Sequence, residues 1–298
     1  MAAVDDLLQR IGALDRTVDA LSDSAFKDQH IQDHLIRGIT VHGLVAIEEF
    51  LRRRMEEWVF SVAAARIPPT HLPGGTKQYE DRIVEVLPRA LRDSLVANRT
   101  TLLEEVGKSL SSLSTGLFLP HTLAFAWPGS NVKTGDIESI VSMVGIDRNR
   151  VWGELTKIWS VVDTQFPGNT NLRVVFEDIS NLRHSGAHSA SLSVPIPNLT
   201  TISRNVKLVC VCIDVVVSER LRKIFAGSTA KPNVPTPRIR LIVQDGREWP
   251  EYPPGSRRAY RRHATQDDAM RAATPRALSA NEIVLARSRA GDILNWAC

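Results

Sequence analysis

The chain contains few cysteines, which bears on its redox chemistry and its compartment. Only 3 of its 298 residues are cysteines. Cys210 and Cys212 lie two positions apart in a segment with a helical pattern, so their side chains should face different directions and pair poorly. Such sparse cysteine usage suits a reducing compartment. We therefore expect a cytoplasmic protein without a disulfide framework.

The sequence also lacks a long hydrophobic run. Its longest apolar stretch, 208–217, contains Asp214 and is too short to span a bilayer. The N-terminal residues include Asp5 and Asp6 and have no basic segment followed by an apolar core, so they do not resemble a signal peptide. These features predict no association with a membrane.

Neither sign of charge dominates. The chain carries 37 basic and 33 acidic residues, for a formal net charge of +4. This mildly basic balance permits nucleic-acid binding without requiring it. With 43% hydrophobic residues, the composition is that of a globular protein with one large domain or a domain with an appendage.

The N-terminal segment has the spacing of a heptad helix. Its apolar residues recur in steps of three and four, as in the seam of a coiled coil: Val4, Leu7, Ile11, Leu14, Val18 and Leu21. Two interpretations remain open at this point. The seam either packs on the rest of its own domain, or it joins two copies of the chain.

The rest of the chain to about residue 226 is also predicted to be helical. Apolar periodicity and breaker residues delimit these helices: 30–64, 78–87, 100–113, 135–144, 149–163, a helix leading into 183, and 199–225. Composition changes at Gly227, and a proline-rich linker follows at 231–237. Beyond it, alternation predicts a strand at 238–244 and a hairpin formed by 282–286 and 293–296.

The most informative segment is 181–188, with the sequence Asn-Leu-Arg-His-Ser-Gly-Ala-His. Arginine binds phosphate oxygens through a planar fork, and histidine exchanges protons near neutral pH. On an ideal helix, Arg183 and His188 would point about 140° apart. We therefore expect Gly186 to break the helix, so that the chain turns and the two side chains meet.

This segment resembles the R-x4-6-H motif of HEPN domains, helical domains found in many prokaryotic ribonucleases. Arg183 and His188 match its fixed positions, and His184 matches the polar residue that follows the arginine. The upstream segment 45–51, Val-Ala-Ile-Glu-Glu-Phe-Leu, is similar to part of the first long helix in the RiboL-PSP branch of that superfamily. The two regions of resemblance cover about a twentieth of the chain.

The residue patterns give an amphipathic heptad helix at 1–25 and a small β-containing basic appendage with its linker at 227–298. The resemblance implies that the segment between them, 26–226, is a HEPN-like helical bundle, so the fold is expected to be mainly α. It also implies a homodimeric endoribonuclease that needs neither metal nor cofactor. The biological context of the family is that of a prokaryotic toxin or antiviral defence effector, controlled by an antitoxin or a defence-system partner.

The family mechanism assigns roles to the motif residues. His188 would exchange a proton with the ribose 2′-OH or the leaving oxygen, and Arg183 would stabilise charge on the phosphate. His184 is the candidate for a second proton-transfer group. Glu48 or Glu49 could orient a motif side chain by a charge-assisted hydrogen bond. Two motifs would meet in one cleft of the dimer.

Other interpretations of these residues remain open. The motif could be a polar helix junction in a non-catalytic dimer that binds RNA or protein, and Glu48 and Glu49 could lie on a solvated helix face. His184 and His188 could bind zinc from an unbroken helix, although no partner ligands are evident. A further possibility is a subunit that is paired with a nucleotidyltransferase or an antitoxin.

The C-terminal segment contains a cluster of arginines around one tyrosine: Arg257, Arg258, Tyr260, Arg261 and Arg262. One interpretation is a solvated loop. The alternative is a contact with the RNA backbone, with the tyrosine ring stacked on a base.

Overall fold

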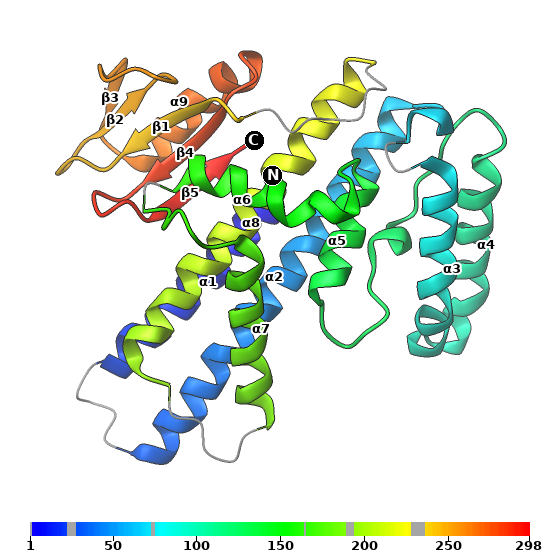
Figure 1. The fold of residues 1–298 in the computed structure, drawn as a ribbon, viewed down its shortest axis with the longest axis horizontal. Helices are drawn as coiled ribbons and strands as arrows, with labels where there is room; N and C mark the ends of the chain where they lie inside the picture. Colours follow the sequence, from blue (N-terminus) through cyan, green and yellow to red (C-terminus); the bar gives the residue numbers. More distant parts are fainter. Residues whose placement is uncertain (1, 23–27, 73–74, 164, 189–193, 228–235) are drawn as a thin grey trace. The chain divides into compact units, whose positions relative to one another are not determined.

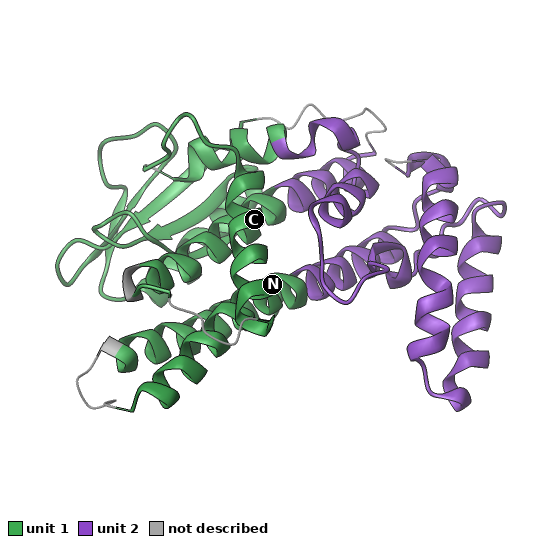
Figure 2. Ribbon diagram, turned by 60° about the horizontal axis from the view of Figure 1, so that its bottom comes forward, with its two compact units in different colours: residues 1–50, 153–215, 236–298 green, residues 51–152, 216–235 purple. Residues whose placement is uncertain are grey.

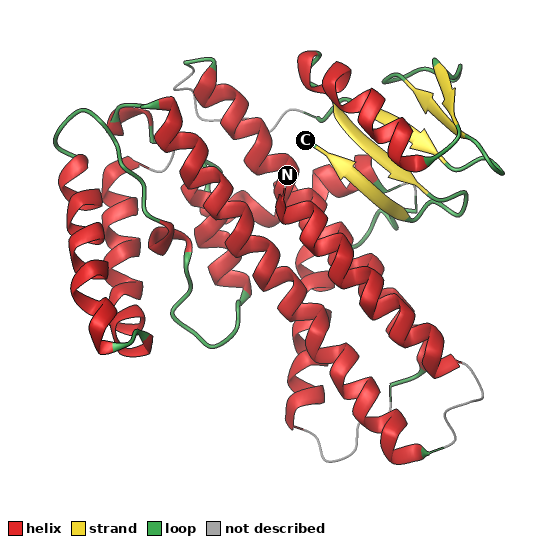
Figure 3. Cartoon of the chain, turned by 180° about the vertical axis from the view of Figure 1, so that it is seen from behind, coloured by secondary structure: helices red, strands yellow, loops and turns green. Residues whose placement is uncertain are grey.

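The computed structural model describes residues 2–22, 28–72, 75–163, 165–188, 194–227 and 236–298. Helices dominate it, and a small five-stranded mixed sheet forms the C-terminal part (Figure 1, Figure 3). The predicted architecture, mainly α with a β-containing C-terminal part, is confirmed. Among the described residues, every helix is too short or too polar to traverse a lipid bilayer.

Each predicted helix is present, although several begin or end a few residues away, and α9 is a helix that was not predicted. They are α1 (Ala2–Ser22), α2 (Gln29–Ala65), α3 (Gly75–Asp93), α4 (Val96–Ser112), α5 (Thr134–Met143), α6 (Val151–Val162), α7 (Leu172–His188), α8 (Ile196–Phe225) and α9 (Gln266–Ser279). The strands are β1 (Ile239–Val243), β2 (Trp249–Tyr252), β3 (Arg261–His263), β4 (Ile283–Arg287) and β5 (Ile293–Ala297).

The chain forms two compact units that are not continuous in sequence (Figure 2). Unit 1 contains 1–50, 153–215 and 236–298, and unit 2 contains 51–152 and 216–235. The N-terminal helix and the C-terminal sheet, which we predicted as separate appendages, both belong to unit 1. The segment predicted as one helical domain, 26–226, is shared between the two units.

The heptad seam of α1 is buried within the chain. All six seam residues have an exposed fraction of 7% or less. A seam already covered by its own chain offers no apolar surface to a second copy. This supports the interpretation that α1 packs on its own domain.

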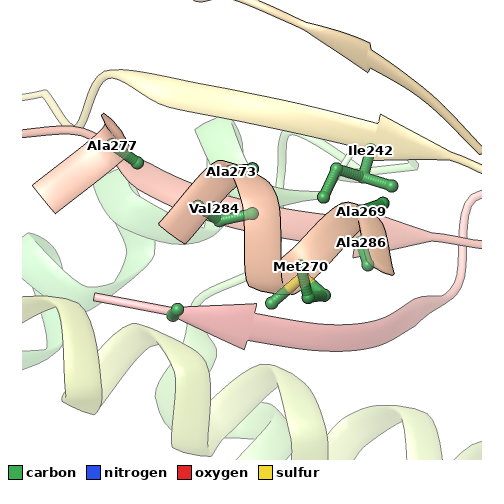
Figure 4. Close-up of a cluster of buried hydrophobic side chains, with 8 residues drawn as sticks. Ile242, Ala269, Met270, Ala273, Ala277, Val284 and Ala286 are labelled. Atoms are coloured by element: carbon green, nitrogen blue, oxygen red, sulfur yellow. The ribbon is translucent and has the colours of Figure 1, made fainter. Parts of the chain in front are cut away.

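The sheet has the strand order β3-β2-β1-β4-β5. β1 and β4 are parallel and are joined by a crossover that includes α9, whereas the other neighbouring pairs are antiparallel. The helix lies over one face of the sheet, where small side chains spaced four residues apart meet aliphatic residues of the strands (Figure 4): Ala269, Ala273, Ala277, Ile242, Val284 and Ala286. The strand predicted at 238–244 and the β4–β5 hairpin are confirmed, whereas β2, β3 and α9 were not predicted.

Polar contacts attach the sheet to the helices of unit 1. Trp296 on β5 is buried, and its Nε1 donates to Asp214 Oδ2 of α8 at 2.8 Å. Gln165 Nε2 donates to the carbonyl oxygen of Ala290 at 2.8 Å, and the Arg287 guanidinium donates to the carbonyl oxygen of Val162. The C-terminal segment is therefore an integral part of unit 1.

An aspartate at the end of α6 organises the neighbouring chain. Asp163 accepts hydrogen bonds from Trp159 Nε1 at 3.0 Å and from the backbone of Gln165 at 2.9 Å, and it pairs with Arg204 at 3.0 Å. Burial alone would raise the pKa of Asp163. The hydrogen bonds and the arginine outweigh burial and hold that pKa below its usual value.

Unit 2 is built around α3, α4 and α5. Tyr79 is fully buried, and its hydroxyl lies 2.7 Å from Ser109 Oγ and accepts from the backbone nitrogen of His121 at 2.6 Å. Trp58 packs edge-on against Phe125 with ring centroids 5.0 Å apart. These contacts join α2, α3, α4 and the segment after α4 into one core.

Candidate functional site

The predicted motif lies on the last turns of α7. The helix begins after Asn171, whose Oδ1 accepts from the backbone nitrogen of Arg173 at 2.9 Å and so caps the first turn. It then continues as regular α-helix to His188. The predicted break at Gly186 is therefore wrong.

Gly186 is required by packing rather than by a turn. It is buried, and a Cβ placed on it would lie 2.1 Å from Thr40 Oγ1 and 3.4 Å from the carbonyl oxygen of Arg37. Because glycine has no side chain, α7 can approach α2 closely at this point. We expected this glycine to act through its backbone freedom, whereas the tertiary contact depends on its small size.

An unbroken helix fixes the relative directions of the motif side chains. His184 and His188 are four residues apart, so they share one exposed face, and their ring centroids lie 4.8 Å apart. Arg183 points about 100° away from His184 and about 140° away from His188. The structure thus brings the two histidines together and leaves Arg183 on a different side of the helix.

Arg183 lies close to the face of α7 that contacts α2. Its Nε is buried and has no hydrogen-bond partner in the described part of the chain. No described carboxylate forms an ion pair with it. The carbonyl end of a helix favours cations and disfavours anions. Any phosphate bound here would therefore depend on the positive charge of this arginine.

The two glutamates from the upstream segment lie elsewhere on α2. Thr40, which contacts Gly186, and Glu48 are eight residues apart, about 12 Å along the helix axis. Glu48 is buried, and Glu49 lies 3.9 Å from Arg10 of α1. None of the three motif side chains has a hydrogen bond to either glutamate among the described contacts. The predicted support from these carboxylates is not formed within the described chain.

The described residues contain no group of three or more histidines, cysteines or carboxylates that could hold a metal ion. His184 and His188 alone would supply two ligands, fewer than the three or four protein ligands of ordinary zinc sites.

The arginine cluster of the C-terminal segment lies around β3. Arg261 and Arg262 are on the strand, and Arg257, Arg258 and Tyr260 precede it in the connection from β2. All five residues are exposed, which is compatible both with a solvated loop and with a contact to the RNA backbone.

A buried ionic network beside this cluster was not predicted. Glu251 on β2 is fully buried and accepts from Arg240 at 2.8 Å and from Arg276 at 2.6 Å. His263 Nε2 lies 3.3 Å from the same carboxylate. These residues come from different elements and are far apart in sequence, so only their tertiary arrangement reveals the network.

Comparison with known proteins gives no match. No protein-family model, no curated protein and no solved structure matches the chain. The resemblance of 181–188 and 45–51 to HEPN domains therefore depends on those residues alone.

Proposed function

We propose that the chain is a metal-independent endoribonuclease of the HEPN type that acts as a homodimer. The observation that carries this proposal is the pair of exposed histidines, His184 and His188, on the same helix end as Arg183, which no carboxylate of the described residues neutralises. Cleavage of RNA by its own 2′-OH needs one base and one acid, and the two imidazoles can supply both.

The proposed reaction is an internal transesterification. One histidine removes the proton from the 2′-OH, and the 2′ oxygen forms a bond to phosphorus while the bond from phosphorus to the 5′ oxygen breaks. The other histidine protonates the departing 5′ oxygen. Arg183 stabilises the charge that builds on the non-bridging oxygens. The products have a 2′,3′-cyclic phosphate and a 5′-hydroxyl.

The direction of Arg183 supports a site shared by two copies. A phosphate that contacts both histidines of one chain lies away from the arginine of that chain, because the side chains diverge by about 100° or more. The arginine of a second copy can fill this gap. Since the α1 seam is already buried, we place the proposed dimer contact on the face that carries the motif rather than on α1.

The proposed biological role follows from the resemblance. It is that of a cytoplasmic toxin or antiviral defence effector in a prokaryote, held inactive by an antitoxin or a defence-system partner until it is triggered. Control by such a partner is needed because unrestrained RNA cleavage would harm the cell that makes the enzyme.

The test is incubation of the purified protein with total RNA and with tRNA in the presence of EDTA. We expect cleavage by the wild type with 2′,3′-cyclic phosphate ends, and loss of cleavage in Arg183→Ala, His184→Ala and His188→Ala. His30→Ala is the matched control, because His30 is an exposed histidine on α2 outside the motif. Circular dichroism and sedimentation should show the same fold and oligomeric state in all variants.

A second candidate is a non-catalytic dimer that binds RNA or protein. The observation in its favour is that Arg183 and His188 do not converge within one chain. Wild-type protein that leaves RNA intact, together with equal tolerance of wild-type and His188→Ala overexpression in cells, would replace the nuclease proposal with this one. Unfolding of His188→Ala would show that the motif is structural.

A further inference from the structure

The arginines around β3 fall into two groups with different electrostatic surroundings. Among the described residues, β3 is an edge strand that pairs with β2 alone, where Arg262 lies opposite Pro250 and Arg261 opposite Glu251. Successive residues of a strand point to opposite faces. Arg262 pairs with Glu248 at 2.7 Å, and this carboxylate raises the pKa of Arg262. No described carboxylate pairs with Arg261.

The connection before β3 adds two more arginines that, like Arg261, have no carboxylate partner among the described residues. The turn is built by Gly255, which has a positive φ of 73°, and by Ser256. Ser256 Oγ accepts from the backbone nitrogen of Arg258 at 3.1 Å and donates to its carbonyl oxygen at 2.9 Å. Arg257 and Arg258 are exposed, and neither pairs with a described carboxylate. This turn therefore carries two further exposed arginines, three and four residues before Arg261.

Tyr260 lies between Arg258 and Arg261 in sequence, and contacts with Glu251 and Arg276 hold it in place. Its backbone nitrogen donates to the carbonyl oxygen of Glu251 at 2.7 Å. Its ring lies 5.4 Å from the guanidinium carbon of Arg276, which is bound at 2.6 Å to the buried carboxylate of Glu251. The residue nevertheless remains 63% exposed. The ring is thus supported by an anchored cation and still offers aromatic surface to a ligand.

We propose that this surface, formed by Arg257, Arg258, Tyr260 and Arg261, binds single-stranded RNA. The three arginines would contact successive phosphates, and one base would stack on the tyrosine ring. A base inside a duplex is stacked on its neighbours and cannot offer a free face, so a single strand fits this surface better than a duplex. The inference deepens the proposed nuclease function by naming its substrate class, and it uses no residue of the α7 motif.

The buried network explains why this surface is ready to bind. Arg276 is fixed by Glu251, which is also bound by Arg240 and lies near His263. A ring that is already held by this network loses little conformational freedom when a base stacks on it. We therefore regard Arg276 and Glu251 as positioning residues, whereas the exposed residues contact the RNA.

The experiment measures fluorescence anisotropy of labelled RNA of about 12 nucleotides, a length within the range of known single-strand sites. The full chain is used with His184→Ala and His188→Ala, which prevents cleavage during the titration. We expect single-stranded RNA to bind more tightly than a duplex of the same sequence. Removing all three free arginines should lower the slope of log K against log salt by about 2.

Matched variants distinguish direct contacts with RNA from effects of net charge and from loss of folding. Tyr260→Ala should weaken binding about 5- to 100-fold, and Tyr260→Phe should leave it nearly unchanged because the ring is kept. Arg261→Ala should weaken binding more than Arg262→Ala, although each variant removes one positive charge, because Glu248 and Asp245 already occupy the Arg262 guanidinium. Equal effects of these two arginine variants, or equal affinity for the duplex, would overturn the inference.

The outcomes distinguish this inference from the proposed nuclease activity. A wild type that binds single-stranded RNA at this surface but never cleaves it would refute the nuclease and retain the binding surface. If the wild type cleaves RNA, and a variant without Tyr260 and the three arginines binds and cleaves RNA equally well, the nuclease proposal would stand and the proposed binding surface would be refuted.

Discussion

Replacing Gly186 by alanine tests whether α7 is continuous through the motif and packed tightly on α2. In an exposed helix interior, this replacement stabilises a protein by about 0.5–1 kcal/mol, because glycine loses more backbone freedom on folding. At Gly186, however, the new methyl group would lie 2.1 Å from Thr40 Oγ1. Optimal contact distances between carbon atoms are about 3.5–4.0 Å, so either the helices move apart or Thr40 changes rotamer.

The change in the free energy of unfolding caused by Gly186→Ala is the balance of these two opposing effects. Overpacking a filled contact costs about 1–3 kcal/mol, which exceeds the gain in helix propensity. We expect Gly186→Ala to lower the free energy of unfolding by about 1–2 kcal/mol. In a Thr40→Ala background, the nearest remaining atoms are the Cβ of residue 40 at 3.3 Å and the Arg37 carbonyl oxygen at 3.4 Å. The methyl group then nearly fits, and the destabilisation should largely disappear.

The assay is urea unfolding followed by far-UV circular dichroism, arranged as a double-mutant cycle. The cycle should give a coupling energy of at least about 1 kcal/mol between positions 186 and 40. Gly38→Ala is the control in the same unit, because a Cβ at Gly38 meets no atom within 4 Å and should stabilise the helix. Stabilisation by Gly186→Ala to the same extent as Gly38→Ala would refute the close approach of the two helices.

Three further predictions follow from the buried polar groups of unit 1. Burial raises the pKa of Cys210 and Cys212, whereas Cys298 is partly exposed. A thiol reagent at neutral pH should therefore modify only Cys298 until the protein is denatured. Because the pKa of Asp163 is lowered in the folded state, its contribution to stability is present above the unfolded pKa of about 4 and is lost as pH falls through the folded value. Arg204→Ala should therefore reduce the difference in urea stability between neutral and acidic pH. Trp296→Phe removes the donor to a buried carboxylate and should lower stability by about 1.5–3 kcal/mol in urea unfolding, whereas unchanged stability would contradict the docking of β5 on α8.

The sequence predicted the elements whose signal is local. α1, α2 and α8 have long apolar periodicity, and the β4–β5 hairpin has two alternating segments around a short turn. Such patterns report which side of an element is buried, and they hold whichever partner covers that side. This is why the fold class and most helix boundaries could be predicted without knowledge of tertiary contacts.

The missed elements have weak or contradictory local signals. α9 contains Pro275, and its buried face consists mainly of alanines, which are less apolar than the residues that mark a core helix. β2 and β3 have four and three residues, and β3 begins with two exposed arginines. Their positions depend on pairing with β1 and on the buried Glu251, both of which are tertiary contacts.

The candidate site shows the same division between local and tertiary information. The residue types of the motif and its place at the end of a helix could be predicted from the sequence. The directions of Arg183, His184 and His188 could not, because they depend on whether Gly186 serves as a break or as a contact with Thr40. The sequence is compatible with both, and packing against α2 decides between them.

The discontinuity of unit 1 has a consequence for the order in which the chain folds. Its three segments are separated by 51–152 and by 216–235, so its core forms only after long loops have closed. Most of unit 2 is one uninterrupted segment with shorter loops, and contacts of that kind form faster. Unit 2 should therefore acquire protected amides first in pulsed hydrogen exchange during refolding. The surface of α7 that carries the histidines would then be completed late, together with the rest of unit 1.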